Sequence, residues 1–225
     1  MNLLDLLLPD VCVLCETTLR PRPAYLLCTY CWQALPWQGN ACHRCGLPLT
    51  DGDVCGACQQ QPLISGRCHI PLVYNSAARH LVQRHKFAQG RREAHALAHS
   101  MLARLWLDQA QLPQAITYVP MTRLAQLRRG HNQAADLAVL LARFSGVPLV
   151  SLLRRQGGKP QREKSRSERQ AMPRRTFKPK CSTDLQHVAL VDDVVTTGST
   201  VRTAVHHLAQ MGITRVDLWA AARAV

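Results

Sequence analysis

The chain has 225 residues, of which 47% are hydrophobic and 19% are charged, and its formal net charge is +14. This length and composition fit one ordinary globular domain plus a small one, and they exclude a chain that is disordered throughout. The apolar start, MNLLDLLLPDVC, lacks a basic leader, is too short to span a bilayer and is interrupted by Asp5 and Pro9. We therefore expect a cytoplasmic protein that does not span the membrane.

Cysteines dominate the first part of the chain. Eight of the ten cysteines form four C-x-x-C pairs, with twelve residues between the first two pairs and nine between the last two. These lengths suit two knuckles and a short hairpin around a tetrahedral zinc ion. Disulfides are disfavoured in a reducing compartment, and one redox dithiol needs fewer cysteines. We expect two structural Zn2+ sites, and both sequential and cross-braced pairings would use the same ligands: Cys12, Cys15, Cys28, Cys31, Cys42, Cys45, Cys55 and Cys58.

The cysteine segment predicts a domain of its own. Residues 1–62 are too few to be stable by apolar burial alone, so we expect metal binding and folding to be coupled there. The remaining residues, 63–225, form the second expected domain.

Strands and helices are expected to alternate in this second domain. Residues 68–75 (CHIPLVYN) predict an edge strand, and residues 90–109 carry apolar side chains at helical spacing. Residues 115–120 (AITYVP) predict a buried strand, and residues 132–146 predict a helix that Asn132 caps and Gly146 ends. Because strand and helix alternate, the fold class is α/β, with a parallel sheet flanked by helices.

A basic stretch follows these elements. From residue 154 to residue 180 there are eleven lysines and arginines against two glutamates. Such a field favours a polyanion, either a nucleic acid or a substrate with several phosphates. A solvated loop that is merely rich in arginine explains the same composition.

The stretch VALVDDVVTTGST, residues 188–200, carries the clearest chemistry. Its four apolar residues predict a short buried strand with Asp192 and Asp193 at its carboxyl end, where open α/β sheets bind ligands. The hydroxyl-rich loop that follows opens a helix, which ends near Gly212, and loop amides at a helix start bind phosphate. Carboxylates beside a phosphate fit a ribose phosphate, because acids accept hydrogen bonds from the sugar diol. An unrelated strand, turn and helix is the alternative interpretation.

Residues 190–200, LVDDVVTTGST, resemble the phosphoribosyl pyrophosphate signature of type I phosphoribosyltransferases. The resemblance implies a type I phosphoribosyltransferase-like fold in which Asp192 and Asp193 are the catalytic acids that take the ribose hydroxyls. It implies Mg2+ as a cofactor together with phosphoribosyl pyrophosphate. The 5'-phosphate would be taken by the loop made of Thr196, Thr197, Gly198, Ser199 and Thr200.

Three further segments are similar to the ComF/GntX family. Residues 119–138 resemble its R-G-F-N-Q block, with His131 in place of the aromatic residue, and residues 81–98 resemble its K-[YF]-x-G-x-R stretch. Residues 159–177 resemble its flexible loop, with Pro160 and Arg175 replacing the usual hydroxyl and asparagine. Together with the double zinc ribbon expected at residues 1–62, the likeness covers nearly the whole chain.

The family resemblance implies DNA uptake, or the use of extracellular DNA as a nutrient. Single-stranded DNA is then an expected partner, and the DNA-uptake machinery or a helicase are candidate protein partners. Contacts to pyrophosphate or DNA would come from basic residues that each also fit an ordinary solvated side chain: Lys86, Arg123, Arg128, Arg129 and Arg169.

Two other functions remain open at this point. The chain could be an active phosphoribosyltransferase of nucleotide metabolism or salvage, although no residues specify an acceptor base. It could also be a regulator that senses the metabolite and signals through its zinc domain.

Overall fold

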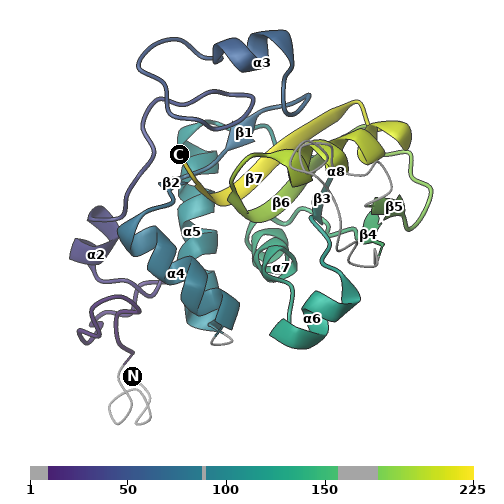
Figure 1. The fold of residues 1–225 in the computed structure, drawn as a ribbon. Helices are drawn as coiled ribbons and strands as arrows, with labels where there is room; N and C mark the ends of the chain where they lie inside the picture. The colour runs from purple at the N-terminus through teal and green to yellow at the C-terminus, as the bar shows by residue number, and fades with distance from the viewer. Residues whose placement is uncertain (1–9, 88–89, 157–176) are drawn as a thin grey trace, which may run out of the picture.

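A computed structural model describes residues 10–87, 90–156 and 177–225, and its central feature is a parallel sheet (Figure 1). The strand order is β1 (Cys68–His69), β7 (Arg215–Arg223), β6 (His187–Val195) and β3 (Ala115–Tyr118), and β2 (Leu72–Val73) also pairs with β7. Every pairing in this sheet is parallel, as the alternation of elements predicts. A separate antiparallel pair joins β4 (Leu153–Arg155) to β5 (Phe177–Pro179).

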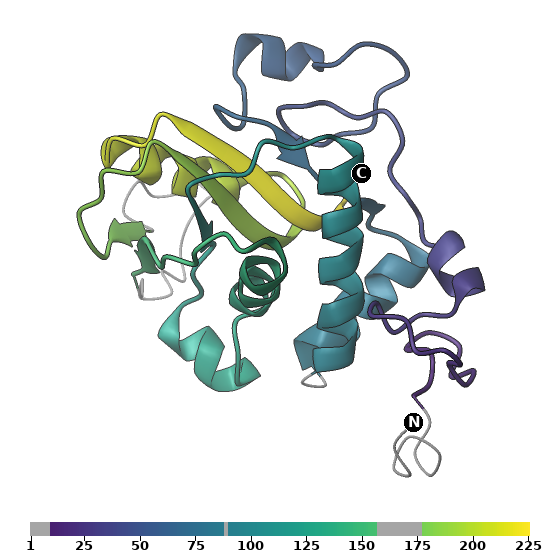
Figure 2. The ribbon, with the colours of Figure 1, turned by 180° about the vertical axis from the view of Figure 1, so that it is seen from behind.

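Helices cover both faces of the sheet. On one face lie α4 (Ser76–Phe87), α5 (Arg91–Leu107) and α7 (Gln133–Ser145) (Figure 2). Their buried side chains share a core with Ile116, Val191 and Trp219. On the other face α8 (Ser199–Gln210) packs in a second core with Leu190 and Leu218. Alternate residues of the strands therefore enter opposite cores, which is why β6 and β7 are apolar along most of their length.

The cysteine segment contributes to both cores. Cys12 and Cys31, at the start of the chain and in α2 (Thr29–Gln33), belong to the core that contains α4, α5 and α7. Cys42 and Cys58, the latter in α3 (Gly56–Gln60), belong to the core that contains α8. The two halves of the segment thus pack against different faces of the sheet.

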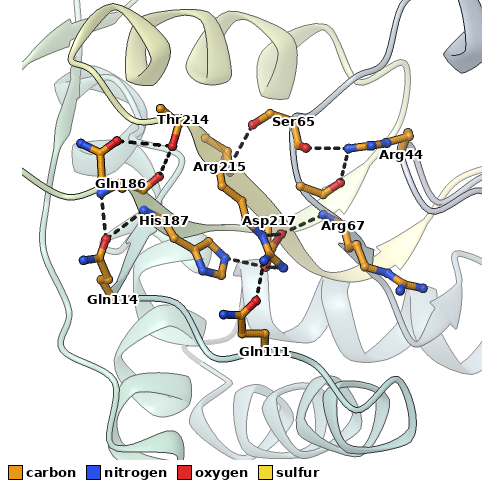
Figure 3. A network of polar contacts seen from close by, with 12 residues as sticks. Arg44, Ser65, Arg67, Gln111, Gln114, Gln186, His187, Thr214, Arg215 and Asp217 are labelled. Carbon is orange, nitrogen blue, oxygen red and sulfur yellow. Dashed lines mark hydrogen bonds and ion pairs between the residues drawn. The ribbon is translucent and has the colours of Figure 1, made fainter.

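A polar network fixes the second half of the cysteine segment to the amino ends of β6 and β7 (Figure 3). Asp217 of β7 is 1% exposed, and its carboxylate accepts hydrogen bonds from the backbone N–H of Arg67 at 2.8 Å and from His187 Nε2 at 2.8 Å. The guanidinium of Arg44 donates to the carbonyl of Ser65 at 2.6 Å. A Cβ at Gly66 would come within 2.0 Å of the Asp217 carboxylate, so this close approach requires glycine.

Several expected elements are confirmed. The helix over residues 132–146 forms as α7; the Asn132 side chain accepts from the N–H groups of Ala134 and Ala135, and Gly146 ends the helix at φ 73°. The helix after Ser199 is confirmed as α8. The edge strand of residues 68–75 is confirmed as two short pieces, β1 and β2.

The expectation that the strand of residues 188–191 ends before the aspartates is wrong. β6 continues to Val195, because its outer half pairs with β7 through Asp192↔Ala220 and Val195↔Arg223. The ladder to β3 on the other side, however, stops at Val191. A backbone ladder on one edge is therefore enough to extend the strand through two charged residues.

Candidate ribose phosphate site and zinc sites

The aspartate pair lies where β6 has lost one neighbour. Beyond the Tyr118↔Val191 pair, β3 no longer covers β6, so Asp192 and Asp193 face an open edge of the sheet. The Asp192 carboxylate accepts from the backbone N–H of Asp193 at 2.9 Å, and the Asp193 carboxylate accepts from Val194 N–H at 2.8 Å. These bonds hold both side chains in place and leave acceptor positions free for a ligand.

Lys86 reaches this edge from the last turn of α4. Its Nζ lies 3.0 Å from Asp193 Oδ2, and the two side chains are 24% and 15% exposed. Burial, followed by the negative charge of Asp193, raises the pKa of Asp192 well above its usual range. The raised pKa reflects the free-energy cost of placing two negative charges side by side in this buried position, and the charge of Lys86 offsets part of that cost.

The loop after β6 leads directly into the amino-terminal end of α8. Gly198 adopts φ 75° directly before α8, and the hydroxyl of Thr197 lies 3.1 Å from that of Ser199. Leu63 contacts Gly198 so closely that an added Cβ would lie 3.0 Å from it. Residues after the second cysteine cluster therefore support the loop that opens the helix.

A hollow of about 390 Å³ joins these parts. Thr200 lines it together with the aspartates, whereas Thr196 and Thr197 are exposed beside it. Of the predicted basic residues, Lys86 and Arg129 line the hollow, Arg123 and Arg128 lie on the neighbouring helix α6 (Arg123–Arg129), and Arg169 lies outside the described residues. Three further lining residues were not predicted as site residues, although Gln133 belongs to the R-G-F-N-Q block and Arg155 to the basic stretch: Thr122, Gln133 and Arg155.

Arg223 connects this region to the second cysteine cluster. Its guanidinium is buried at the end of β7, and it donates to the carbonyl of Cys45 at 3.0 Å and to that of Val195 at 2.9 Å. It also donates to the carbonyl of Thr196. One side chain therefore bonds both a zinc knuckle and the first residue of the predicted phosphate loop.

The cysteines form two clusters with sequential pairing. Within each set, the four sulfur atoms lie within 4.8 Å of one another: Cys12, Cys15, Cys28 and Cys31 in one, and Cys42, Cys45, Cys55 and Cys58 in the other. The cross-braced alternative is excluded by these sets. The Sγ atoms of Cys15 and Cys28 are 3.7 Å apart, as are those of Cys45 and Cys55. Zinc–sulfur bonds of about 2.3 Å place tetrahedral sulfur ligands about 3.8 Å apart, so both sets fit Zn2+.

Hydrogen bonds to sulfur favour the thiolate of one cysteine in each cluster, whereas burial raises the pKa of Cys31, Cys45 and Cys58. The Thr17 hydroxyl and backbone lower the pKa of Cys15 to about 6. Burial alone would raise the pKa of Cys42, but N–H donors of Cys55 and Arg44 bring it down to about 7. Such N–H donors stabilise the ligand form that zinc needs.

In the described part of the chain, no helix has the length and apolarity needed to cross a membrane.

Comparison with known proteins agrees with this architecture. Residues 3–59 match the family described as Double zinc ribbon domain. The DNA utilization protein YhgH of Salmonella typhimurium is 30% identical, over 97% of this chain and 99% of its own. The Competence protein F of Haemophilus influenzae is 32% identical, over 81% of this chain and 84% of its own. The Competence protein ComFC of Bacillus subtilis is 25% identical, over 90% of both chains. The extent of these matches shows that the chain belongs to the family of the DNA utilization protein YhgH and Competence protein F.

Proposed function

We propose that this protein acts in the uptake or utilization of DNA, and that its hollow at β6 binds phosphoribosyl pyrophosphate or another ribose 5-phosphate. The relatives named for DNA utilization and competence support the process. The observation that carries the ligand is the placement of Asp192 and Asp193 at an open strand edge, in one hollow with the start of α8.

The ligand would be recognised in two parts. The carboxylates of Asp192 and Asp193 accept hydrogen bonds from the ribose hydroxyls, and the N–H groups at the start of α8 bind the 5'-phosphate. Arg129 and Arg155, which line the same hollow, supply positive charge for a pyrophosphate group. Mg2+ would accompany that group and neutralise part of its charge.

Single-stranded DNA fits a different surface. A second hollow, of about 610 Å³, lies between the first zinc module and helices α5 and α7, and Arg22, Arg91, Arg92 and Arg143 line it. The rings of His99 and Phe144, also in its lining, are 4.7 Å apart. Positive charge with adjacent aromatic rings is the combination that binds backbone phosphates and stacks bases without sequence preference.

Paired variants test this DNA surface. Arg91→Ala with Arg143→Ala should weaken the binding of a fluorescent oligothymidine strongly and should reduce its salt dependence, because each lost phosphate contact removes about 0.7 from the log–log salt slope. Arg79→Ala, on the exposed side of α4, is the matched control and should leave the affinity unchanged. Equal affinity of all three proteins, or no DNA binding even at low salt, would remove the DNA part of the proposal.

Phosphoribosyl transfer is a second candidate function. It is favoured by the presence of the acid pair and the anion loop in one open hollow. In an active enzyme, the same groups would hold the sugar while positive charge develops at its anomeric carbon. A panel of free bases, assayed for pyrophosphate release, tests it; release with none of them leaves binding as the role of the hollow.

A further inference from the structure

A third hollow, of about 470 Å³, lies between α4, α5 and α7 and contains a group of metal-ligating side chains. His85 comes from the last turn of α4, His131 directly precedes the N-cap residue of α7, and Asp136 lies in the first turn of α7. All three line the hollow, and one ligand atom from each lies within 4.8 Å of the other two. The group contains no cysteine and is separate from both zinc clusters.

The ligand atoms are nearly at metal-binding separation. Asp136 Oδ2 lies 3.9 Å from His85 Nε2 and 3.7 Å from His131 Nε2. Metal bonds of about 2.0–2.2 Å place tetrahedral nitrogen and oxygen ligands about 3.4 Å apart. The two distances to Asp136 would have to shorten by about half an ångström, for which its 42% exposed side chain has the freedom, and the two imidazole nitrogens, which lie within 4.8 Å of each other, would have to adjust as well.

His85 is oriented as ligating histidines are. It is 2% exposed, and its Nδ1 lies 3.2 Å from the carbonyl oxygen of Gly90. Donation from Nδ1 to that carbonyl, the shorter of its two backbone contacts, leaves the lone pair on Nε2, which lies 3.5 Å from the Gln133 carbonyl oxygen and 3.9 Å from Asp136 Oδ2. The Gly90 carbonyl that accepts this bond lies in a tightly packed segment. Gly90 sits so close to the Glu93 side chain that a Cβ would not fit, and Glu93 is held by an ion pair with Arg84 at 2.9 Å.

His131 supplies the second nitrogen. Its Nε2 lies 3.1 Å from the Gln133 side-chain nitrogen and 2.9 Å from the carbonyl of His85. The 2.9 Å contact fits a hydrogen bond from Nε2–H to the His85 carbonyl. A metal ion at this atom would therefore require the tautomer with its proton on Nδ1 and a turn of the ring away from the His85 carbonyl and the Gln133 amide.

We propose that His85, His131 and Asp136 bind a divalent transition-metal ion whose open coordination positions face the hollow. Two imidazoles and one carboxylate select ions such as zinc, cobalt, nickel or iron(II) over magnesium and calcium. Arg91 and His95 line the same hollow, so an anionic oxygen ligand fits the open positions. This site is independent of the ribose phosphate hollow and of the two structural zinc sites.

Cobalt binding tests the proposal on the full-length chain with both cysteine clusters filled by zinc. Wild type should bind one equivalent of Co2+ with d–d absorption and without a sulfur-to-cobalt charge-transfer band. His131→Phe, which keeps an aromatic ring beside His85, and Asp136→Asn should each weaken this binding at least tenfold, with zinc content unchanged. His80→Phe, at an exposed position of α4, is the matched control and should bind as wild type does.

Three outcomes would refute the proposed metal site. They are no cobalt binding by zinc-loaded wild type, binding that Asp136→Asn leaves unchanged, and cobalt spectra that show thiolate ligation. Thermal unfolding of the variants distinguishes lost ligation from lost fold, because Asp136 is partly exposed and its substitution by asparagine opens no cavity.

Discussion

Replacement of Asp193 by asparagine separates ligand binding from folding at the ribose phosphate hollow. The side chain has two roles: one oxygen accepts from Val194 N–H at 2.8 Å, and the other pairs with Lys86 at 3.0 Å. Asparagine keeps an acceptor for the backbone N–H and fills the same volume. It loses the charge that Lys86 neutralises and that a ribose diol would use.

The cost to stability follows from these contacts. Loss of a charge-assisted hydrogen bond in a mostly buried pair costs about 1.5–3 kcal/mol. Removal of the repulsion with Asp192, which raises the pKa of that neighbour, offsets part of this cost. We expect a net loss of about 1–2 kcal/mol and a Tm lower by about 2–8 °C in a chain of this size.

The same substitution should also weaken ligand binding. A charged acceptor of the diol contributes about 1.5–3 kcal/mol, so Asp193→Asn should raise the Kd for phosphoribosyl pyrophosphate about 10–100-fold in calorimetric titrations with Mg2+. Asp184→Asn, at an exposed position before β6, is the matched control and should change neither Tm nor Kd. An unfolded Asp193→Asn variant would show that the carboxylate is structural, and an unchanged Kd would refute the assignment of the acid pair.

Three further predictions concern the neighbouring acid Asp192, the zinc ligand Cys42 and the buried acid Asp108. The raised pKa of Asp192 means that the folded state binds more protons than the unfolded state, so the free energy of unfolding should fall as pH rises between the usual pKa and the raised one. Asp192→Asn should remove this fall, which thermal unfolding scans at a series of pH values would measure. A lower Tm for this variant than for wild type at pH 8 would contradict the reasoning. Cys42→Ser should reduce the measured zinc content from two ions per chain to one and unfold the second module, and retention of both ions would disprove its ligand set. Burial alone would raise the pKa of Asp108, but the hydrogen bond from His69, at 2.7 Å, and the charge of Arg104 lower it. Its stabilising contribution is therefore present above the unfolded pKa and is lost as pH falls through the lower folded value; Asp108→Asn should cost about 1–3 kcal/mol at neutral pH, and an equal cost at pH 3 would be inconsistent with this reasoning.

Local signals explain the elements that could be predicted. Asn132 and Gly146 delimit α7 by interactions with the helix's own backbone, and such contacts depend little on the rest of the fold. β7 was not predicted, because its sequence RVDLWAAAR contains three consecutive alanines that favour helix as a local sequence. It is a strand because β6 pairs with one of its edges and β1 and β2 with the other.

The same division applies to the candidate site. Asp192, Asp193 and the hydroxyl loop lie in one segment, residues 192–200, so a local motif is enough to predict them as a site, and the family resemblance implies its phosphoribosyl pyrophosphate ligand. Thr122 and Arg155 enter the hollow from segments distant from β6, and the basic stretch that contains Arg155 does not indicate which of its side chains lines the hollow. The hydrogen bond from Arg223 to the Cys45 carbonyl likewise could not be predicted. It joins residues 178 positions apart and forms only because the second cysteine cluster packs against the end of β7.

The most direct test of the proposed function is calorimetric titration of the zinc-loaded protein with phosphoribosyl pyrophosphate and Mg2+, alone and with single-stranded DNA already bound. We predict one binding event per chain, abolished or strongly weakened by Asp193→Asn, with an affinity that changes when DNA is present. Failure of the wild-type protein to bind the metabolite, while it still binds DNA, would contradict a ribose phosphate site and confine the function to the zinc modules and the basic surface.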